Sequence, residues 1–93
     1  MKQESTYELV VTPPARRAIA ETLPEGVAAA VIDFMTSALV GNPQRVGKPL
    51  RDDLAGVWAA RRGTYRILYR INDSVREVVV LRVEHRRDSY RPL

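Results

Sequence analysis

Near the middle of this 93-residue chain the spacing of the apolar residues changes from helical to strand-like, and that change constrains the fold more than any other feature. Between residues 24 and 43, apolar side chains recur at helical spacing, with Val27, Val31 and Met35 on one stripe. In the second half of the chain the spacing becomes two, which is typical of strands. In residues 65–71, for example, tyrosine and isoleucine alternate with arginine and leucine. Helices are therefore expected in the first half of the chain and most strands in the second.

This pattern predicts an α+β fold with the element order β-α-α-β-β-β in a single domain of residues 1–93. Two helices that each bury one stripe must cover one face of a small, mostly antiparallel sheet. The last strand has a near-continuous apolar centre, which predicts an interior place in that sheet. We expect residues 44–56 to form a loop with two turns. The predicted elements are a strand at 7–12, helices at 12–23 and 24–43, and strands at 57–62, 65–71 and 75–85.

The composition excludes several classes of site. The chain has no cysteine and one histidine, so disulfides and thiolate metal sites are ruled out and a structural zinc site is not expected. We therefore expect neither a metal nor a cofactor. No apolar run approaches the roughly 20 residues of a membrane span, and the first ten residues have no signal-peptide core. The cytoplasm is the expected location.

The charge of the chain is uneven. The net charge is +4; residues 1–50 hold five basic and five acidic residues, and residues 51–93 hold ten arginines and six acidic residues. The whole excess is therefore arginine in the second half. Arginine presents a planar fork that matches phosphate oxygens and stacks on bases, which favours a nucleic acid or an acidic protein as partner. A solvated arginine-rich surface explains the same composition.

Three arginines are predicted to meet at one end of the sheet. Arg61 and Arg66 flank a tight turn at Gly63-Thr64, which would bring them close together. Arg86 follows the last strand and reaches the same end if that strand is a neighbour. Because guanidinium groups repel one another unless an anion joins them, this cluster predicts a phosphate-binding site.

Two stretches of the sequence are similar to a known family. The pattern L-x-G-x-x-x-x-R-x-G-x-Y-R-x-x-Y spans Leu54 to Tyr69, and H-R-R-D-x-Y spans His85 to Tyr90. Both stretches, at this spacing in a short basic chain, resemble the RelE toxins of bacterial toxin–antitoxin pairs, within the wider RelE/ParE superfamily. The resemblance covers nearly the whole chain.

The resemblance implies an mRNA interferase that needs no metal and cuts messenger RNA in the ribosomal A site. In this reaction the ribose 2′-OH attacks its own 3′ phosphate and leaves a 2′,3′-cyclic phosphate and a 5′-OH. By position, Arg61 and Arg66 match residues that hold the phosphate. Arg86 matches an arginine that stabilises the transition state or protonates the leaving oxygen. Tyr90 matches a tyrosine proposed as general base or stacking platform.

Physical chemistry leaves the identity of the base open. A tyrosine acting as base at pH 7 must have its pKa lowered by about three from its usual value near 10, which costs roughly 4 kcal/mol. A histidine needs no such change, because its usual pKa is about 6.5. Chemistry alone therefore favours His85, whereas the resemblance favours Tyr90 and Arg86. In a regular strand His85 shares the face of Leu81 and Val83, which would turn it towards the helices.

The resemblance also implies partners and one departure from the family pattern. It predicts a RelB-like or Phd-like antitoxin in a hetero-oligomer, together with the ribosome and messenger RNA. Further candidate contacts to RNA are Arg45, Lys48, Arg51 and Arg87. Many relatives carry a second basic residue where this chain has Ala59. The alanine would weaken the stabilisation of negative charge on the phosphate.

Two other functions stay open. ParE-type toxins of the same superfamily inhibit DNA gyrase and are not nucleases, although they lack the C-terminal arginine and tyrosine found here. The second open function is a catalytically inactive RNA-binding module. The uncharged Ala59 favours this function.

Overall fold

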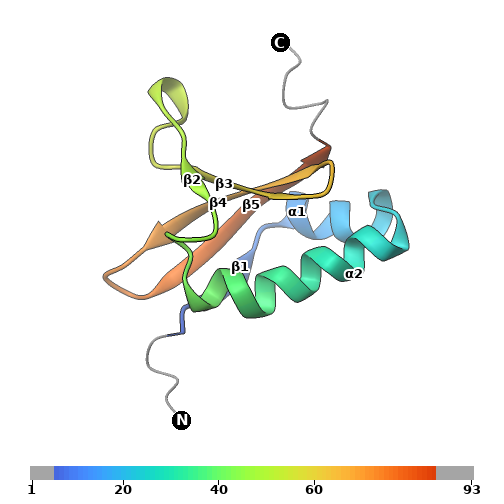
Figure 1. Ribbon diagram of the computed structural model, residues 1–93, viewed down its shortest axis with the longest axis horizontal. Helices are drawn as coiled ribbons and strands as arrows, with labels where there is room; N and C mark the ends of the chain where they lie inside the picture. Colours follow the sequence, from blue (N-terminus) through green and yellow to red (C-terminus); the bar gives the residue numbers. More distant parts are fainter. Residues whose placement is uncertain (1–5, 86–93) are drawn as a thin grey trace.

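The computed structural model describes residues 6–85 of the chain, which form a five-stranded sheet with helices on one face (Figure 1). The strand order is β1-β5-β4-β3-β2. Strand β1 is parallel to β5, and the other neighbours are antiparallel. The elements are β1 (Glu8–Val11), α1 (Pro13–Arg17), α2 (Glu25–Phe34), β2 (Lys48–Pro49), β3 (Trp58–Arg62), β4 (Tyr65–Asn72) and β5 (Glu77–His85). The predicted α+β fold is confirmed, as is the interior place of the last strand.

The two helices begin where the sequence predicts. The Thr12 hydroxyl accepts a hydrogen bond from the Ala15 N–H at 3.4 Å and donates one to the Leu81 carbonyl at 2.8 Å. Thr12 therefore caps α1 and also ties its first turn to β5. Wider turns of π type extend the helices, over Ala18–Thr22 after α1 and over Met35–Leu39 after α2. No helix within residues 6–85 is long and apolar enough to cross a membrane.

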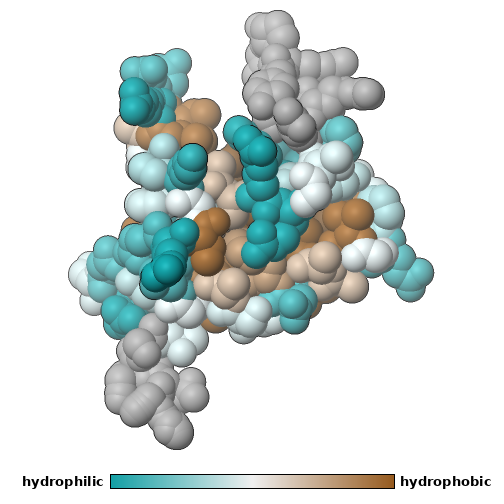
Figure 2. All heavy atoms as spheres, in the orientation of Figure 1, coloured by the Kyte–Doolittle hydropathy of each residue, from teal (hydrophilic) through white to brown (hydrophobic). Residues whose placement is uncertain are grey.

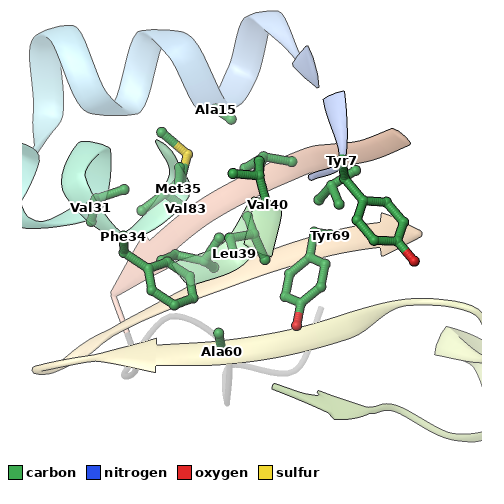
Figure 3. Packing of buried hydrophobic residues seen from close by; sticks show 13 residues of the cluster. Tyr7, Ala15, Val31, Phe34, Met35, Leu39, Val40, Ala60, Tyr69 and Val83 are labelled. Atoms are coloured by element: carbon green, nitrogen blue, oxygen red, sulfur yellow. The ribbon is translucent and has the colours of Figure 1, made fainter. Parts of the chain in front are cut away.

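The helices and the sheet enclose one apolar core (Figure 3). The apolar stripe predicted for the second helix faces this core, and Val31 and Leu39 on it are fully buried. Tyr69 and Ile67 of β4 meet them from the sheet. In Figure 2, apolar side chains gather over the middle of the visible face, whereas hydrophilic ones project from the loop between β2 and β3. The core therefore lies on one side of the sheet, and no helix of residues 6–85 covers the other side, which is called the helix-free face below.

The structure differs from the prediction in the segment expected to be a loop. Lys48 and Pro49 form the short edge strand β2, paired with Ala59 and Trp58 of β3. A two-residue strand has no periodicity to detect, and proline within a sheet is confined to such edges. The pairing depends on β3, which is why the local sequence does not reveal it.

A second difference is an irregularity in β5. Leu68 pairs with Arg82 while the next residue, Tyr69, pairs with Val80, so Leu81 has no partner in the register. This bulge means that Val80 and Val83 both face the core, and Leu81 is absent from the core cluster. The simple alternation assumes a regular strand, and the bulge shows that β5 is not regular.

Candidate functional site

Two neighbouring rows of side chains cross the helix-free face of the sheet. In β3 and β4, Ala60 and Ile67 pair and face the core. The adjacent pair, Arg61 and Arg66, therefore lies on the opposite face, and Glu84 of β5 continues that row. The next row consists of Lys48, Ala59, Leu68 and Arg82, one residue from each of four strands.

The turn between β3 and β4 brings the two central arginines together, as predicted. Gly63 in this turn has a φ of 62°, a left-handed conformation that glycine adopts at little cost. The turn places Arg61 directly opposite Arg66 in the antiparallel register. Like charges directly opposite each other destabilise a sheet, and an anion bound between the two guanidinium groups would offset this cost.

An open pocket of about 460 Å³ lies over these residues, between the β2 segment and strands β3 and β4. Three of its lining side chains are cations, Lys48, Arg61 and Arg66, and its described lining contains no carboxylate. A concave site with three positive charges and no acid favours an anion such as a phosphate group. The remaining lining residues are Val46, Gly47, Leu50, Ala59 and Ala60.

Arg66 has an unsatisfied atom in this pocket wall. Its Nε is buried and has no hydrogen-bond partner among residues 6–85. Its cross-strand neighbour Glu84 lies 3.6 Å from Arg82, measured from Glu84 Oε1 to Arg82 Nη1. A buried donor without a partner is costly, so holding Arg66 in this wall lowers the stability of the fold.

The structure separates the residues predicted from the sequence into three groups. It brings Lys48, Arg61 and Arg66 together in the pocket. It leaves Arg45 and Arg51 exposed on the adjoining loop, outside the pocket lining. The predicted site residues Arg86, Arg87 and Tyr90 lie outside the described residues.

His85 lies on the helix side of the sheet. It pairs with Tyr65 in the register, and the two rings meet edge to face with centroids 5.1 Å apart and an interplanar angle of 80°. Val83, two residues earlier on β5, is part of the core. The structure therefore does not bring His85 into the basic pocket, in agreement with the predicted orientation.

The aromatic residues behind the pocket pack into the fold. Trp58 packs against the core and stacks with Tyr69 at a centroid distance of 6.4 Å. The Tyr69 hydroxyl donates a hydrogen bond to the Pro43 carbonyl at 2.7 Å. Burial raises the pKa of Tyr69 to about 12, so its hydroxyl stays protonated at neutral pH.

Sequence reasoning did not assign a role to two charged residues on the helix-free face, Arg82 and Glu84. The signal that could have found them is the alternation of β5, where both flank the buried Val83. The bulge at Leu81 obscures this signal, because it shifts the alternation in the middle of the strand. Within residues 6–85, no three His, Cys, Asp or Glu side chains are placed to hold a metal ion.

The fold and the pocket define a small α+β protein with a basic pocket on its sheet, and sequence comparison gives its family. The family described as "ParE toxin of type II toxin-antitoxin system, parDE" matches residues 9–90, so this chain belongs to that toxin family. Toxin RelG of Mycobacterium tuberculosis is 53% identical over 85 residues, covering 91% of this chain and 97% of the relative. Toxin RelE of the same organism is 42% identical over 91 residues, covering 98% and 93%. The resemblance to RelE toxins is thereby confirmed.

Solved structures agree with this assignment. The toxin–antitoxin complex RelBE2 of M. tuberculosis contains a chain that is 52% identical, with a TM-score of 0.82 over 87% of this chain and 99% of that one. The E. coli RelBE complex contains a chain with a TM-score of 0.72 over 85% and 95%. That chain is only 18% identical, so the likeness supports the fold alone.

Proposed function

We propose that this protein is a ribosome-dependent mRNA interferase, an endoribonuclease that cuts messenger RNA in the ribosomal A site and so inhibits translation. The observation that carries the proposal is the pocket lined by Lys48, Arg61 and Arg66 with no carboxylate in its described lining. Such a pocket suits a phosphodiester, whose transition state gains negative charge on the phosphoryl oxygens. The similarity to toxins named RelE and RelG supports the same function.

The reaction is an internal transfer at phosphorus. The ribose 2′-oxygen forms a bond to the adjacent phosphorus while the bond from phosphorus to the 5′-oxygen breaks. The 2′-hydroxyl loses its proton to a base, and the leaving 5′-oxygen gains one. The products are a 2′,3′-cyclic phosphate and a 5′-OH. Arg61 and Arg66 hold the phosphoryl oxygens in this scheme, because a guanidinium donates hydrogen bonds but accepts none.

Proton transfer is assigned to residues beyond the described strands. Tyr90 acts as general base or stacks on a base of the RNA, and Arg86 stabilises the transition state or protonates the leaving oxygen. The resemblance supports both assignments. The position of His85 on the helix side of the sheet, against Tyr65, supports them too.

The partner that neutralises this toxin is an acidic antitoxin of the RelB-like or Phd-like kind, in a hetero-oligomer. The 52% identical chain belongs to a structure described as a toxin–antitoxin complex, which supports this proposal. The net charge of +4 and the arginine-rich second half suit a partner rich in carboxylates. Because a toxin that acts on translating ribosomes must reach them, we propose that the protein works in the cytoplasm.

A second function is inhibition of DNA gyrase without nuclease activity. The observation that favours it is the matching family description, which carries the ParE name. The two functions predict different damage in a cell that makes the toxin, and one experiment separates them.

Primer extension on messengers from cells induced to make this protein alone tests the proposed function. We expect new cuts inside reading frames, restricted to messengers that ribosomes are translating. An untranslated copy of the same messenger, lacking its ribosome-binding site, is the matched control and should stay intact. Intact messengers together with trapped or relaxed gyrase complexes would instead support the second function.

A further inference from the structure

Ala59 leaves a position without charge in the middle of the pocket wall. It lies between Lys48 and Leu68 in the register and two residues before Arg61 on the same strand. Residues two apart in a strand share a face, so Ala59 and Arg61 both face the pocket. A small side chain at this position leaves open space between the charges on either side.

Lys48 stands directly across from that position. In antiparallel strands, side chains of directly paired residues lie on the same face with Cβ atoms about 4.5–5.5 Å apart. Lys48 pairs with Ala59, and both line the same pocket as Arg61 and Arg66. A lysine side chain is long enough to bring its ammonium group over the alanine opposite.

The backbone around Lys48 is held on both sides. Before it, Gly47 lies against both β3 and β4: an added Cβ would overlap the hydroxyl of Tyr69 in β4 and lie 2.7 Å from the carbonyl oxygen of Ala59 in β3. After it, the Leu50 N–H donates to the Val57 carbonyl at 2.8 Å. The position of Lys48 at the pocket is therefore fixed by the fold, although its side chain is exposed.

No described carboxylate neutralises Lys48. Glu84 lies 3.6 Å from Arg82, and the described pocket lining contains no acid. No acidic side chain of the described pocket lining competes with a ligand for the Lys48 ammonium group. The charge that Ala59 fails to supply from β3 is thus available from β2.

We infer that Lys48 is a catalytic residue whose ammonium group contacts a non-bridging oxygen of the scissile phosphate, in the place left open by Ala59. This inference rests on the proposed function, since it names a further contact to the same phosphodiester. It also means that Ala59 does not imply an inactive protein: the third cation comes from the neighbouring strand.

The test is single-turnover cleavage of messenger on programmed ribosomes with saturating toxin. Lys48→Gln should lower the rate constant by roughly tenfold to a hundredfold, less than the loss of a buried donor, because the side chain is exposed. Lys48→Arg should retain most of the rate. Adding Ala59→Lys to Lys48→Gln should restore activity, because the new charge starts from the facing position.

Arg17→Gln on the exposed surface of α1 removes the same charge away from the pocket and should cut at the wild-type rate. A Lys48→Gln protein that cuts at the wild-type rate while Arg66→Gln is slow would overturn the inference and leave the proposed function intact. The inference would also be overturned if Lys48→Gln is slow but both Lys48→Arg and the double variant with Ala59→Lys are equally slow. Wild-type protein that leaves ribosome-bound messenger intact would overturn the proposed function itself.

Discussion

Tyr69 and His85 lie near the basic pocket, yet both side chains are held on the helix side of the sheet. Tyr69 is fully buried and donates to the Pro43 carbonyl, and burial raises its pKa to about 12. It cannot accept a proton from a ribose hydroxyl at neutral pH. The ring of His85 meets the ring of Tyr65 edge to face, on the opposite face of the sheet from Arg66. Neither residue is therefore our choice for proton transfer.

Substitutions at His85, Arg86 and Tyr90 test this choice. Arg86→Ala and Tyr90→Phe should each lower single-turnover cleavage by about a hundredfold to ten-thousandfold, the usual range for general acid–base groups. His85→Gln should cost a modest part of the rate but lower the melting temperature. The reason is the lost contact with Tyr65, because such aromatic pairs contribute about 0.5–1.5 kcal/mol.

Melting curves and cleavage rates measured on the same preparations distinguish the outcomes. A His85→Gln protein that melts normally but does not cut would make His85 the proton-transfer group. Fully active Arg86→Ala protein would remove the C-terminal segment from the mechanism.

Strand β2 forms one side of the pocket, and Gly47 allows the chain before β2 to lie close against the sheet. Gly47→Ala should destabilise the protein by about 1–3 kcal/mol, the usual cost of forcing an atom into a packed site. Backbone atoms of Ala59 block the new methyl group, so β2 must shift and carry Lys48 with it. Urea unfolding measures the first effect, and cleavage on ribosomes measures the second.

Gly41→Ala is the matched control for this substitution. A Cβ at Gly41 meets nothing within 4 Å, and its φ is not positive. This variant should keep the stability and activity of the wild type. Equal behaviour of the two variants would show that the close approach at Gly47 does not position β2.

The elements differ in how far local sequence determines them. Thr12 and the two prolines after it specify a helix start, and Gly63 specifies a turn, by chemistry that acts over a few residues. Strand β2 and the bulge at Leu81 depend on pairing with other strands. The sequence therefore predicts Arg61 opposite Arg66, but it does not predict that Lys48 faces Ala59.

The two faces of the sheet have different roles: one packs against the core and the other carries the basic pocket. Helices α1 and α2 cover one face and bury the core (Figure 1). The side chains of Lys48, Arg61 and Arg66 line a pocket on the other face. The alternation of β4 alone predicts this division, because its tyrosines and isoleucines face one way and its arginines the other. The alternation does not predict the pocket, because the pocket also needs the β2 segment next to β3.

Charge on the helix-free face also predicts how the antitoxin binds. An acidic antitoxin should associate more slowly as salt is raised, because charge complementarity acts mainly on the association rate. Stopped-flow or surface-based association measurements between about 50 and 500 mM salt would show this, since the Debye length falls well below 10 Å over that range. An association rate independent of salt would mean that the apolar contacts of the helices dominate the complex.

The most direct test of the account is the chemistry of the cut ends. Purified protein, added to programmed ribosomes free of other nucleases, should cleave the messenger in the A site. The upstream fragment should end in a 2′,3′-cyclic phosphate and the downstream fragment should begin with a 5′-OH, because the ribose hydroxyl is the nucleophile. Arg61→Gln and Arg66→Gln should slow this cut, and Arg17→Gln should not. A downstream fragment that begins with a 5′-phosphate would identify water as the nucleophile and contradict the account.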